Sequence, residues 1–449
     1  MESKRLTGAI VIAILFASIL VTLQPQQSIS AEALAKIDPN LVKQMEAGKA
    51  NEDGSFTALV KVAWDVDLGS IKFDRDNVIS LLQTEAARTQ EPVITYLRLK
   101  RNTEILNTFW LANLILVKAD VDTIKEVATL STVEKVLMNF RITVPEDQGT
   151  RQIDTNNPAM ATWNIEKVRA PDVWEQLGIT GEGMKFATED TGVDITHQDL
   201  ADTLFTADPN DPTYPGGWAE FDSNGYWVSG SVPHDTWIHG TATYGLIVGD
   251  SKGPFGAVGM APGAKGLGMH ALSLPGGGGS FPQVLAGLEW ILDPYDEYGN
   301  HYPMPRVSSH SWGAFGYRTE LIDVVRNIYF AGHFIIASIG NGGEGSSGSP
   351  GNYPETFGIG ATDVNDYVPS WSSGEVIQKT DFPTAPDDWP DQWVKPDVSA
   401  PGENVIVPVP GNQYIYWGGT SFSSPHVGGA AVLMLSGNPT LNPDELRTA

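Results

Sequence analysis

The sequence contains no cysteine among its 449 residues. Disulfide bonds, thiolate catalysis and cysteine-ligated metal sites are therefore excluded, and any bound metal must be held by oxygen or histidine ligands. Basic residues are also scarce, because 28 Lys and Arg stand against 54 Asp and Glu and give a net charge of -26. A phosphate backbone requires a basic surface, so this balance argues against nucleic acid as a partner.

Long apolar runs are absent beyond the N-terminus. Lys4 and Arg5 precede an uncharged run from about residue 8 to residue 23, and small residues follow up to Ala31. This order predicts a signal peptide over residues 1–31 and a secreted protein, with the membrane involved only through this segment. The alternative is an uncleaved anchor that keeps the protein at the cell surface, because the uncharged stretch approaches spanning length.

Residues 32–144 predict a small α+β domain of the split βαβ, ferredoxin-like type. Strand and helix patterns alternate there, at 56–64, 77–87, 111–119, 120–130 and 133–144. The next segment, residues 145–162, is polar, rich in turn formers and without periodicity, and it predicts an exposed linker.

Residues 163–449 predict an α/β domain with a mainly parallel central sheet covered by helices on both faces. Strand patterns lie at 184–190, 263–272, 306–313, 333–341 and 356–363, with helical patterns at 240–249, 281–292 and 320–332. Ligands of such folds bind at the carboxyl ends of the strands, so polar residues at strand ends are the candidate site.

Four polar residues follow strands or begin helices in this domain, in the order Asp190, His239, Asn341 and Ser421. Each has an ordinary alternative explanation: a turn cap, a capping or core histidine, an Asn-Gly turn, and a capped core helix. The helix after Ser421 is predicted to be buried nearly all round, with Pro425 in its first turn. A serine at such a helix start lies where free N–H groups favour negative charge, as acyl transfer requires.

The motifs EDTGVDITHQDL, HGTATYG, GMAPGAK, IGNGG, VKPDVSAPG and GGTSFSSPHV resemble those of the subtilisin-like serine proteases. The resemblance extends over about residues 163–449, and the stretch at 163–183 is most similar to bacillopeptidase F-like members. Residues 32–144 are similar to the family's inhibitory pro-domains. The resemblance implies a three-layer subtilisin-like fold and a self-processing zymogen, cleaved within 145–162, that hydrolyses protein or peptide substrates.

The same resemblance implies the roles of the four residues. Ser421 is the nucleophile, His239 the general base and acid, and Asp190 the residue that orients the imidazole. The Asn341 side chain and the Ser421 amide form the oxyanion hole. No cofactor is required for this chemistry. His426 and His234 are weaker candidates for the base.

Two glycine-containing segments match the strands that flank the family's cleft and are expected to pair with extended peptide. They are Gly276, Gly277 and Gly278, and Ser311, Trp312 and Gly313. Ser338, Ile339 and Gly340 are expected to line the first specificity pocket. Asp199 matches a calcium ligand of the family, and Asp250 in the loop 249–257 is a second candidate ligand for structural calcium.

Two residues depart from the family pattern: Ala242 replaces a second histidine, and Glu189 replaces an apolar residue. Strand alternation points Glu189 away from Asp190, and burial would be costly without a partner. The chain also ends within a helical pattern at 442–449, which favours a fragment of a longer protein.

Two other functions fit the sequence less well. An esterase or lipase should show Gly-x-Ser-x-Gly with the serine first in the chain, and neither holds here. A catalytically inactive binding or adhesion protein on the same fold should lack a catalytic residue, and none is missing.

Overall fold

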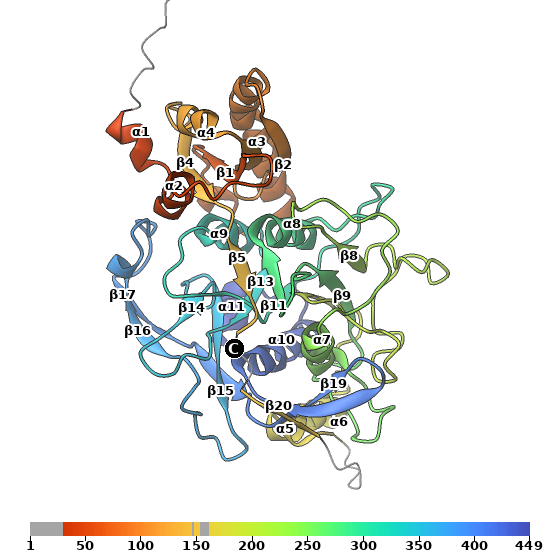
Figure 1. The fold of residues 1–449 in the computed structure, drawn as a ribbon. Coiled ribbons are helices and arrows are strands. Elements are labelled where there is room, and N and C mark those ends of the chain that lie inside the picture. The colour runs from red at the N-terminus through yellow and green to blue at the C-terminus, as the bar shows by residue number, and fades with distance from the viewer. Residues whose placement is uncertain (1–29, 146–147, 153–160) are drawn as a thin grey trace, which may run out of the picture.

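The computed structural model describes residues 30–145, 148–152 and 161–449. Figure 1 shows a small N-terminal part above a larger part, with β5 running from one into the other. The predicted signal peptide lies almost entirely outside the described residues. None of the helices in the described ranges has the length and apolar character needed to span a bilayer.

The N-terminal part is an α+β unit with a four-stranded antiparallel sheet in the order β2-β3-β1-β4. Asp74 and Asp120 begin its two main helices by accepting hydrogen bonds from the amides of Asn77 and Thr123. The elements are α1 (Ala31–Ala35), α2 (Pro39–Glu46), β1 (Phe56–Val62), η1 (Gly69–Ile71), α3 (Arg75–Arg98), β2 (Glu104–Phe109), β3 (Leu114–Ala119), α4 (Val121–Val127), β4 (Val133–Met138) and β5 (Arg141–Thr143).

Both faces of this small sheet are covered. Val60 and Val117 pack with Val93 of α3, whereas Leu59 and Leu116 belong to the same apolar cluster as helices of the larger part. The strand β2 was not predicted from the sequence. The predicted strand over 133–144 is two strands, because β5 leaves this sheet and pairs with β10 (Gly278–Ser280).

The larger part confirms the predicted α/β fold. Its central sheet has the order β18-β15-β13-β11-β7-β9-β8, and all six neighbouring pairs are parallel. The sheet strands are β7 (Lys185–Asp190), β8 (Trp218–Glu220), β9 (Lys265–His270), β11 (Val307–His310), β13 (Phe334–Ser338), β15 (Phe357–Thr362) and β18 (Val398–Pro401).

Helices cover both faces of this sheet and make three layers (Figure 1). Alternation along β7 sends Phe186 into the cluster with α7 and α10, and Ala187 into the cluster with α8 and α9. The helices are α5 (Trp163–Lys167), α6 (Ala170–Leu177), α7 (His239–Val248), α8 (Phe281–Leu292), α9 (Ile322–Phe330), α10 (Thr420–Gly437) and α11 (Pro443–Thr448).

Helix α10 is almost entirely buried, as predicted, and it begins directly before Ser421. Pro425 lies inside the helix rather than in its first turn, which corrects the prediction. Its N-cap is Gly419 with φ 152°, a conformation that side chains rarely adopt, so glycine is required where the chain turns from β20 (Gln413–Trp417) into the helix.

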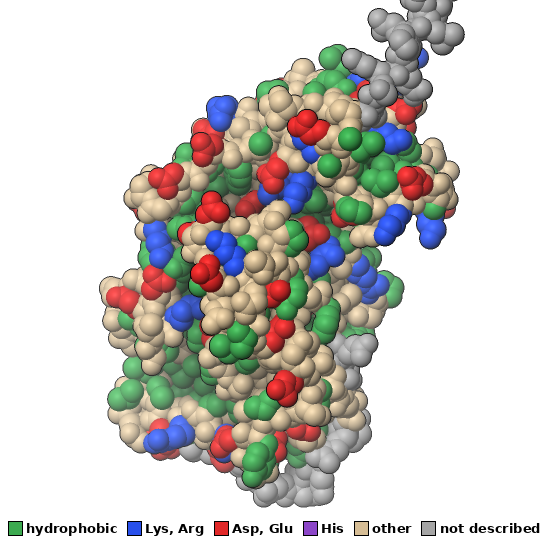
Figure 2. Space-filling view, turned by 90° about the vertical axis from the view of Figure 1, so that its left-hand side faces the viewer, with side chains coloured by type: hydrophobic (Ala, Val, Ile, Leu, Met, Phe, Trp, Pro, Cys, Tyr) green, Lys and Arg blue, Asp and Glu red, His purple; other side chains and the backbone are tan. Residues whose placement is uncertain are grey.

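The predicted linker contains a short strand. Within residues 145–162, β6 (Thr150–Gln152) pairs antiparallel with β20, which in turn pairs with β19 (Val405–Val409). Four further short strands lie outside the central sheet, namely β12 (Ala314–Phe315), β14 (Gly348–Ser349), β16 (Glu375–Gln378) and β17 (Gln392–Lys395), with the short helix η2 (Lys379–Asp381). On the face shown in Figure 2 acidic and basic side chains are interspersed, so this face has no basic stripe suited to a phosphate backbone.

Candidate active site

Asp190 and His239 are brought together at one edge of the sheet. Asp190 is the last residue of β7, and His239 is the first residue of α7. His239 Nδ1 lies 2.8 Å and 2.9 Å from the two carboxylate oxygens of Asp190. The Thr191 amide and the Thr243 hydroxyl donate to the same carboxylate at 2.7 Å and 3.2 Å. This buried contact places a proton on Nδ1 and leaves Nε2 as the basic nitrogen.

Aromatic rings surround the His239 imidazole. Trp237 stacks on it with ring centroids 5.9 Å apart, and Trp417 and Phe422 contact it at 5.8 Å and 5.6 Å. No motif of the sequence marks these rings. They restrict rotation of the imidazole and exclude water from its contact with Asp190.

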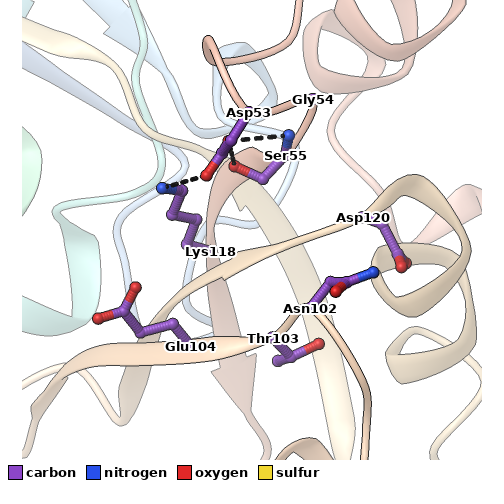
Figure 3. Close-up of a pocket in the computed structure, with 8 residues that line it drawn as sticks. All are labelled: Asp53, Gly54, Ser55, Asn102, Thr103, Glu104, Lys118 and Asp120. Atoms are coloured by element: carbon purple, nitrogen blue, oxygen red, sulfur yellow. Dashed lines mark hydrogen bonds and ion pairs between the residues drawn. The ribbon is translucent and has the colours of Figure 1, made fainter.

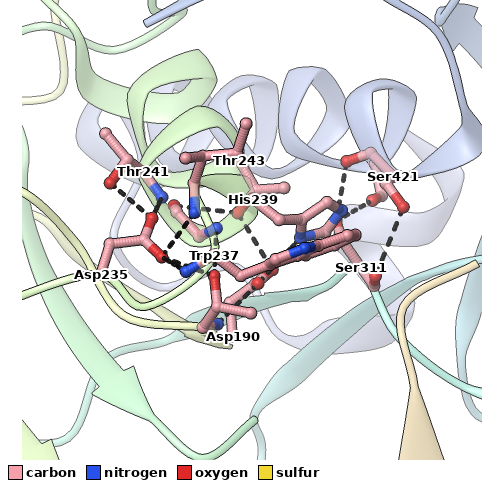
Figure 4. A network of polar contacts seen from close by, with 12 residues as sticks. Asp190, Asp235, Trp237, His239, Thr241, Thr243, Ser311 and Ser421 are labelled. Carbon is pink, nitrogen blue, oxygen red and sulfur yellow. Dashed lines mark hydrogen bonds and ion pairs between the residues drawn. The ribbon is translucent and has the colours of Figure 1, made fainter. Parts of the chain in front are cut away.

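A half-buried aspartate that the sequence analysis missed, Asp235, shapes the loop before His239 (Figure 4). One of its oxygens accepts hydrogen bonds from the amides of Trp237 and Ile238, at 2.9 Å and 3.0 Å. The other accepts from the amide and the hydroxyl of Thr241, at 2.7 Å and 2.6 Å. Burial raises the pKa of Asp235, and these hydrogen bonds oppose the shift. An acidic residue just before a helix start was the available signal.

Ser421 lies in the first turn of α10, and Figure 4 shows the His239 ring between Asp190 and Ser421. The Ser421 hydroxyl donates to the Ser311 carbonyl at 3.3 Å, and the Ser311 hydroxyl donates to the Ser421 carbonyl at 2.7 Å. Among the described residues His239 Nε2 has no hydrogen-bond partner. The Ser421 hydroxyl is therefore bound to the Ser311 carbonyl and not to His239 in this structure.

Asn341 follows β13 and faces the start of α10. Its amide oxygen accepts hydrogen bonds from the Thr420 amide at 3.0 Å and the Thr420 hydroxyl at 2.8 Å. This pairing fixes the plane of the Asn341 side-chain amide beside Gly419. A Cβ added at Gly419 would lie 3.3 Å from Asn341 Nδ2, so the side-chain NH₂ packs directly against this glycine. The side-chain NH₂ and the N-terminus of α10 thus lie at one place, where both favour a negative charge.

The predicted cleft segments hold an extended stretch of the chain itself. Strand β5 pairs antiparallel with β10, so that Thr143 faces Gly278. Thr143 also exchanges two backbone hydrogen bonds with Gly313, at 3.2 Å and 2.9 Å, and the Val144 amide donates to the Gly277 carbonyl at 3.0 Å. The predicted peptide-binding edges therefore pair with β5 and the residue after it.

A pocket lies beyond this strand. It is lined by Pro145, Gly313, Ser338, Gly340 and Asn341 among others. Ile339 is not among the residues that line it, which corrects the expectation; its side chain is fully buried, and its backbone is hydrogen-bonded to Ile359 and Gly348. Trp312 lines the pocket and is itself almost fully buried.

Glu189 is fully buried beside α8, and His310 Nδ1 lies 3.6 Å from its carboxyl. Burial, with a smaller contribution from Asp190, raises the pKa of Glu189 well above its ordinary value. Burial lowers the pKa of His310 to about 3. His310 and His333 each lie 2.7 Å from the Ser308 hydroxyl, which bridges them. Glu189, which replaces an apolar residue of the family pattern, is therefore buried as a neutral carboxylic acid beside the neutral imidazole of His310.

The two rival histidines lie elsewhere. His426 is buried, with Nδ1 2.7 Å from the Phe422 carbonyl and Nε2 2.8 Å from Asn164. Burial lowers its pKa to about 4, as expected for a neutral structural histidine. His234 lies near Glu220 and His270 rather than at Ser421.

The two carboxylates expected to bind calcium, those of Asp199 and Asp250, have other partners in this structure. The Tyr414 hydroxyl donates to one carboxylate oxygen at 2.6 Å, and the Gly253 amide donates to the other. Asp250 pairs with Lys252 at 2.8 Å. Burial raises the pKa of Asp199 to about 6. A calcium ion would have to compete with these hydrogen-bond donors and with the Lys252 ammonium. Calcium at this site stays a prediction, which melting with and without a chelator tests.

Another hollow, on the N-terminal part, is lined by polar side chains, and several of them bind one another (Figure 3). Lys118 lies 2.6 Å from Asp53, and Ser55 also donates to that carboxylate. The Lys118 ammonium, with Ser55, holds the pKa of Asp53 well below its ordinary value. This hollow contains none of the four candidate residues.

Comparison with known proteins finds relatives that agree with the resemblance seen in the motifs. The sequence is 33% identical over 420 residues to bacillopeptidase F of Bacillus subtilis (strain 168), a match covering 88% of this chain and 28% of that protein. It is 31% identical over 288 residues to subtilisin Savinase of Lederbergia lenta, covering 64% of this chain and 88% of the relative. It is 30% identical over 254 residues to the thermophilic serine proteinase of Bacillus sp. (strain AK1), covering 57% of this chain and 52% of the relative.

The chain thus spans little more than a quarter of bacillopeptidase F, but most of subtilisin Savinase. Residues 181–449 match the subtilase family, also called peptidase S8. That match takes in β7, α7 and α10, which carry the candidate residues, and it extends over more than half of the sequence. The resemblance found in the motifs is confirmed, and the chain belongs to the subtilase family of serine peptidases.

Proposed function

We propose that the protein is a secreted serine endopeptidase that cleaves peptide bonds with Ser421, His239 and Asp190 and is made as a self-processing zymogen. The observation that carries the proposal is the convergence of these residues on a cleft whose edges pair with an extended stretch of polypeptide, β5. An enzyme acting on proteins needs such backbone pairing for its substrate.

In the proposed mechanism His239 Nε2 takes the proton from Ser421 as Oγ attacks the scissile carbonyl. The bond between Oγ and the carbonyl carbon forms, and the negative oxygen is bound by the Asn341 side-chain amide and the Ser421 backbone N–H. His239 then gives its proton to the leaving amine as the C–N bond breaks. Water hydrolyses the acyl-enzyme by the same route in reverse, and Asp190 stabilises the imidazolium each time.

The positions of these groups support the roles. The Asp190 carboxylate already has two partners besides the histidine, the Thr191 amide and the Thr243 hydroxyl, so its orientation does not depend on His239. Asn341 is held by Thr420, the residue directly before the nucleophile. The oxyanion donors therefore need little reorganisation when charge develops.

Residues 32–144 act as an inhibitory pro-domain in this proposal. The unit packs on α8 and α9, and β5 occupies the cleft edges, so a substrate cannot pair there while the unit is bound. Folding assistance is a second role, because a parallel sheet with distant pairings forms slowly. The bond to be cut lies in residues 145–162, after the stretch that occupies the cleft.

Maturation and catalysis are tested together by comparing wild type with Ser421→Ala, each expressed without other proteases. Wild type should yield a chain beginning between about residues 145 and 163, and the variant should fold and persist uncut. Processing of the variant at the same bond, seen by mass spectrometry, would rule out self-maturation.

A peptide chromogenic substrate separates the protease from an inactive binding protein on the same fold. The mature protein should hydrolyse it and lose activity when a serine-directed phosphonate modifies Ser421. A folded, processed protein without hydrolysis would contradict the proposal. Recovery of the protein from culture medium, with a shortened N-terminus, tests secretion.

A further inference from the structure

Glu220, His234 and His270 converge outside the catalytic residues. Glu220 ends β8, His270 ends the neighbouring strand β9, and His234 lies in the loop that leads to His239. One donor atom from each lies within 4.8 Å of the other two. His270 Nδ1 is 3.1 Å from one Glu220 oxygen, and His234 Nε2 is 4.0 Å from the other.

Neighbouring groups leave the inward-facing nitrogen of each imidazole available as a ligand. His234 Nδ1 lies 2.8 Å from the Val232 carbonyl, which can only accept, so Nδ1 carries the proton and Nε2 has the lone pair. His270 Nε2 lies 3.0 Å from the Thr236 hydroxyl, whose oxygen accepts a hydrogen bond from Nε2–H when Nδ1 is a ligand. The Ser231 hydroxyl donates to Glu220. Such outer contacts commonly orient histidine and carboxylate ligands of metals.

The geometry suits a small divalent ion. Ligand bonds of about 2.0–2.2 Å in a tetrahedron place neighbouring donor atoms about 3.3 Å apart. The 3.1 Å separation between His270 Nδ1 and one Glu220 oxygen already matches this value. His234 Nε2 lies 4.0 Å from the other Glu220 oxygen, and one donor atom from each of the three residues lies within 4.8 Å of the other two, so side-chain adjustment is needed to bring all three to this spacing. Two imidazoles and a carboxylate are a common protein ligand set for zinc, with water in the fourth position.

Access and charge favour the same ion. The His234 side chain is 40% exposed, whereas that of Glu220 is 18% exposed and that of His270 is 3% exposed. An ion can therefore reach the site from solvent on the side of His234 and be held by two ligands fixed on the sheet. The strong negative charge of the chain raises the local concentration of cations.

We propose that Glu220, His234 and His270 bind one divalent transition-metal ion, with Zn²⁺ as the preferred ion among those commonly available. The ion joins the ends of β8 and β9 to the loop that carries Asp235 and leads to His239. The loop is already joined to the segment that follows β7, because the His234 carbonyl accepts a hydrogen bond from the Val193 amide. Metal binding would therefore stabilise the segment that positions the catalytic histidine, without supplying any catalytic group.

The competing arrangement is a hydrogen-bonded cluster without metal. In that case His270 Nδ1 is protonated and donates to Glu220, and Nε2 accepts from Thr236. Addition of Zn²⁺ would then leave the melting temperature unchanged. The two arrangements differ in metal content, which makes them separable by direct measurement.

The test uses the full chain as Ser421→Ala, which prevents self-digestion. The protein is stripped with chelator, titrated with Zn²⁺ by calorimetry, and loaded separately with Co²⁺ for its visible spectrum. We expect one ion per chain, a rise in melting temperature on adding Zn²⁺, and a Co²⁺ spectrum typical of tetrahedral nitrogen and oxygen ligation. Absence of stoichiometric binding to the folded protein would overturn the proposal.

Matched variants locate the ion. His234→Ala removes the most exposed ligand and should fold, yet lower Zn²⁺ affinity by at least about 100-fold. Glu220→Gln keeps the size of the side chain, removes its charge and should weaken binding similarly. His301→Ala removes an exposed histidine that pairs with Asp293 and should bind Zn²⁺ as the parent does. Undiminished binding in His234→Ala and Glu220→Gln, or its loss in a His239→Ala variant instead, would place the ion elsewhere and refute the site.

Discussion

Replacement of Glu189 by glutamine should stabilise the protein at alkaline pH. The Glu189 carboxyl is fully buried, none of the described residues forms a hydrogen bond with it, and burial raises its pKa well above the ordinary 4.5. The folded protein therefore holds this proton more tightly than the unfolded chain does. The favourable contribution is complete below about pH 4.5 and is lost as pH rises toward the folded pKa. Glutamine has the same shape and does not ionise.

The magnitude follows from the linkage between proton binding and folding. In the pH range between the unfolded and the folded pKa, one carboxyl costs about 1.4 kcal/mol of stability per pH unit. His310 contributes in the opposite direction at lower pH, since its folded pKa of about 3 lies below its ordinary 6.5. That contribution is common to parent and variant and cancels in their difference. Stability of Glu189→Gln relative to its parent should therefore rise by about 1.4 kcal/mol per pH unit across this range.

The assay is urea unfolding followed by tryptophan fluorescence, in a Ser421→Ala background, from about pH 5 to about pH 8. Glu175→Gln, which removes a carboxylate from the exposed side of α6, is the matched control and should show no such slope. If Glu189→Gln is instead less stable than its parent at alkaline pH, Glu189 is ionised and forms an ion pair with His310. The assignment of a neutral acid would then be wrong.

Three further substitutions test the site. Asn341→Ala should lower kcat about 10²–10³-fold with little change in KM, the size of the effect known from removing the oxyanion asparagine of subtilisin, and steady-state kinetics on a peptide substrate measures it. Gly277→Ala should slow processing and raise KM for extended peptides. The new Cβ would lie 2.3 Å from Val144 and 2.5 Å from Trp237, at a backbone φ of +67° that favours glycine. Normal processing in a time course would contradict the pairing of this segment with β5 and the residue after it. Asp235→Asn removes the oxygen that accepts two hydrogen bonds from Thr241, and it should cost about 1–3 kcal/mol of stability. It should also lower kcat more than it raises KM. An unchanged kcat would show that the loop does not position His239.

The local sequence predicted five of the seven strands of the central sheet and the helices between them, but not β8 or β18. Helix α8 spans residues 281–292 as predicted, because Ser280 caps it and its apolar residues recur with helical spacing. The apolar strand patterns that became β7 and β13 end at Asp190 and just before Asn341. Parallel strands place their carboxyl ends at one edge, so the chain order of these motifs was enough to predict a shared site.

The N-terminal part shows where local patterns failed. Strand β2 has mixed polarity and weak alternation, and its assignment depends on pairing with β3. The residues 133–144 have one continuous strand pattern, yet β4 completes the small sheet and β5 pairs with β10 about 137 positions later. The strand propensity of a segment depends on the residues within it, so it cannot show which distant strand the segment will pair with.

The sequence by itself thus determined the fold class, the family and the identity of the four candidate residues. Only the tertiary structure decided that Asp235 orders the loop before His239, that Glu189 lies beside His310, and that Glu220, His234 and His270 meet. These side chains come from segments up to 121 positions apart, and their pKa shifts and ligand geometry depend on burial and on distances of a few ångströms. A sequence pattern fixes which face of an element is buried, whereas the packing of elements against one another fixes which polar groups share that buried space.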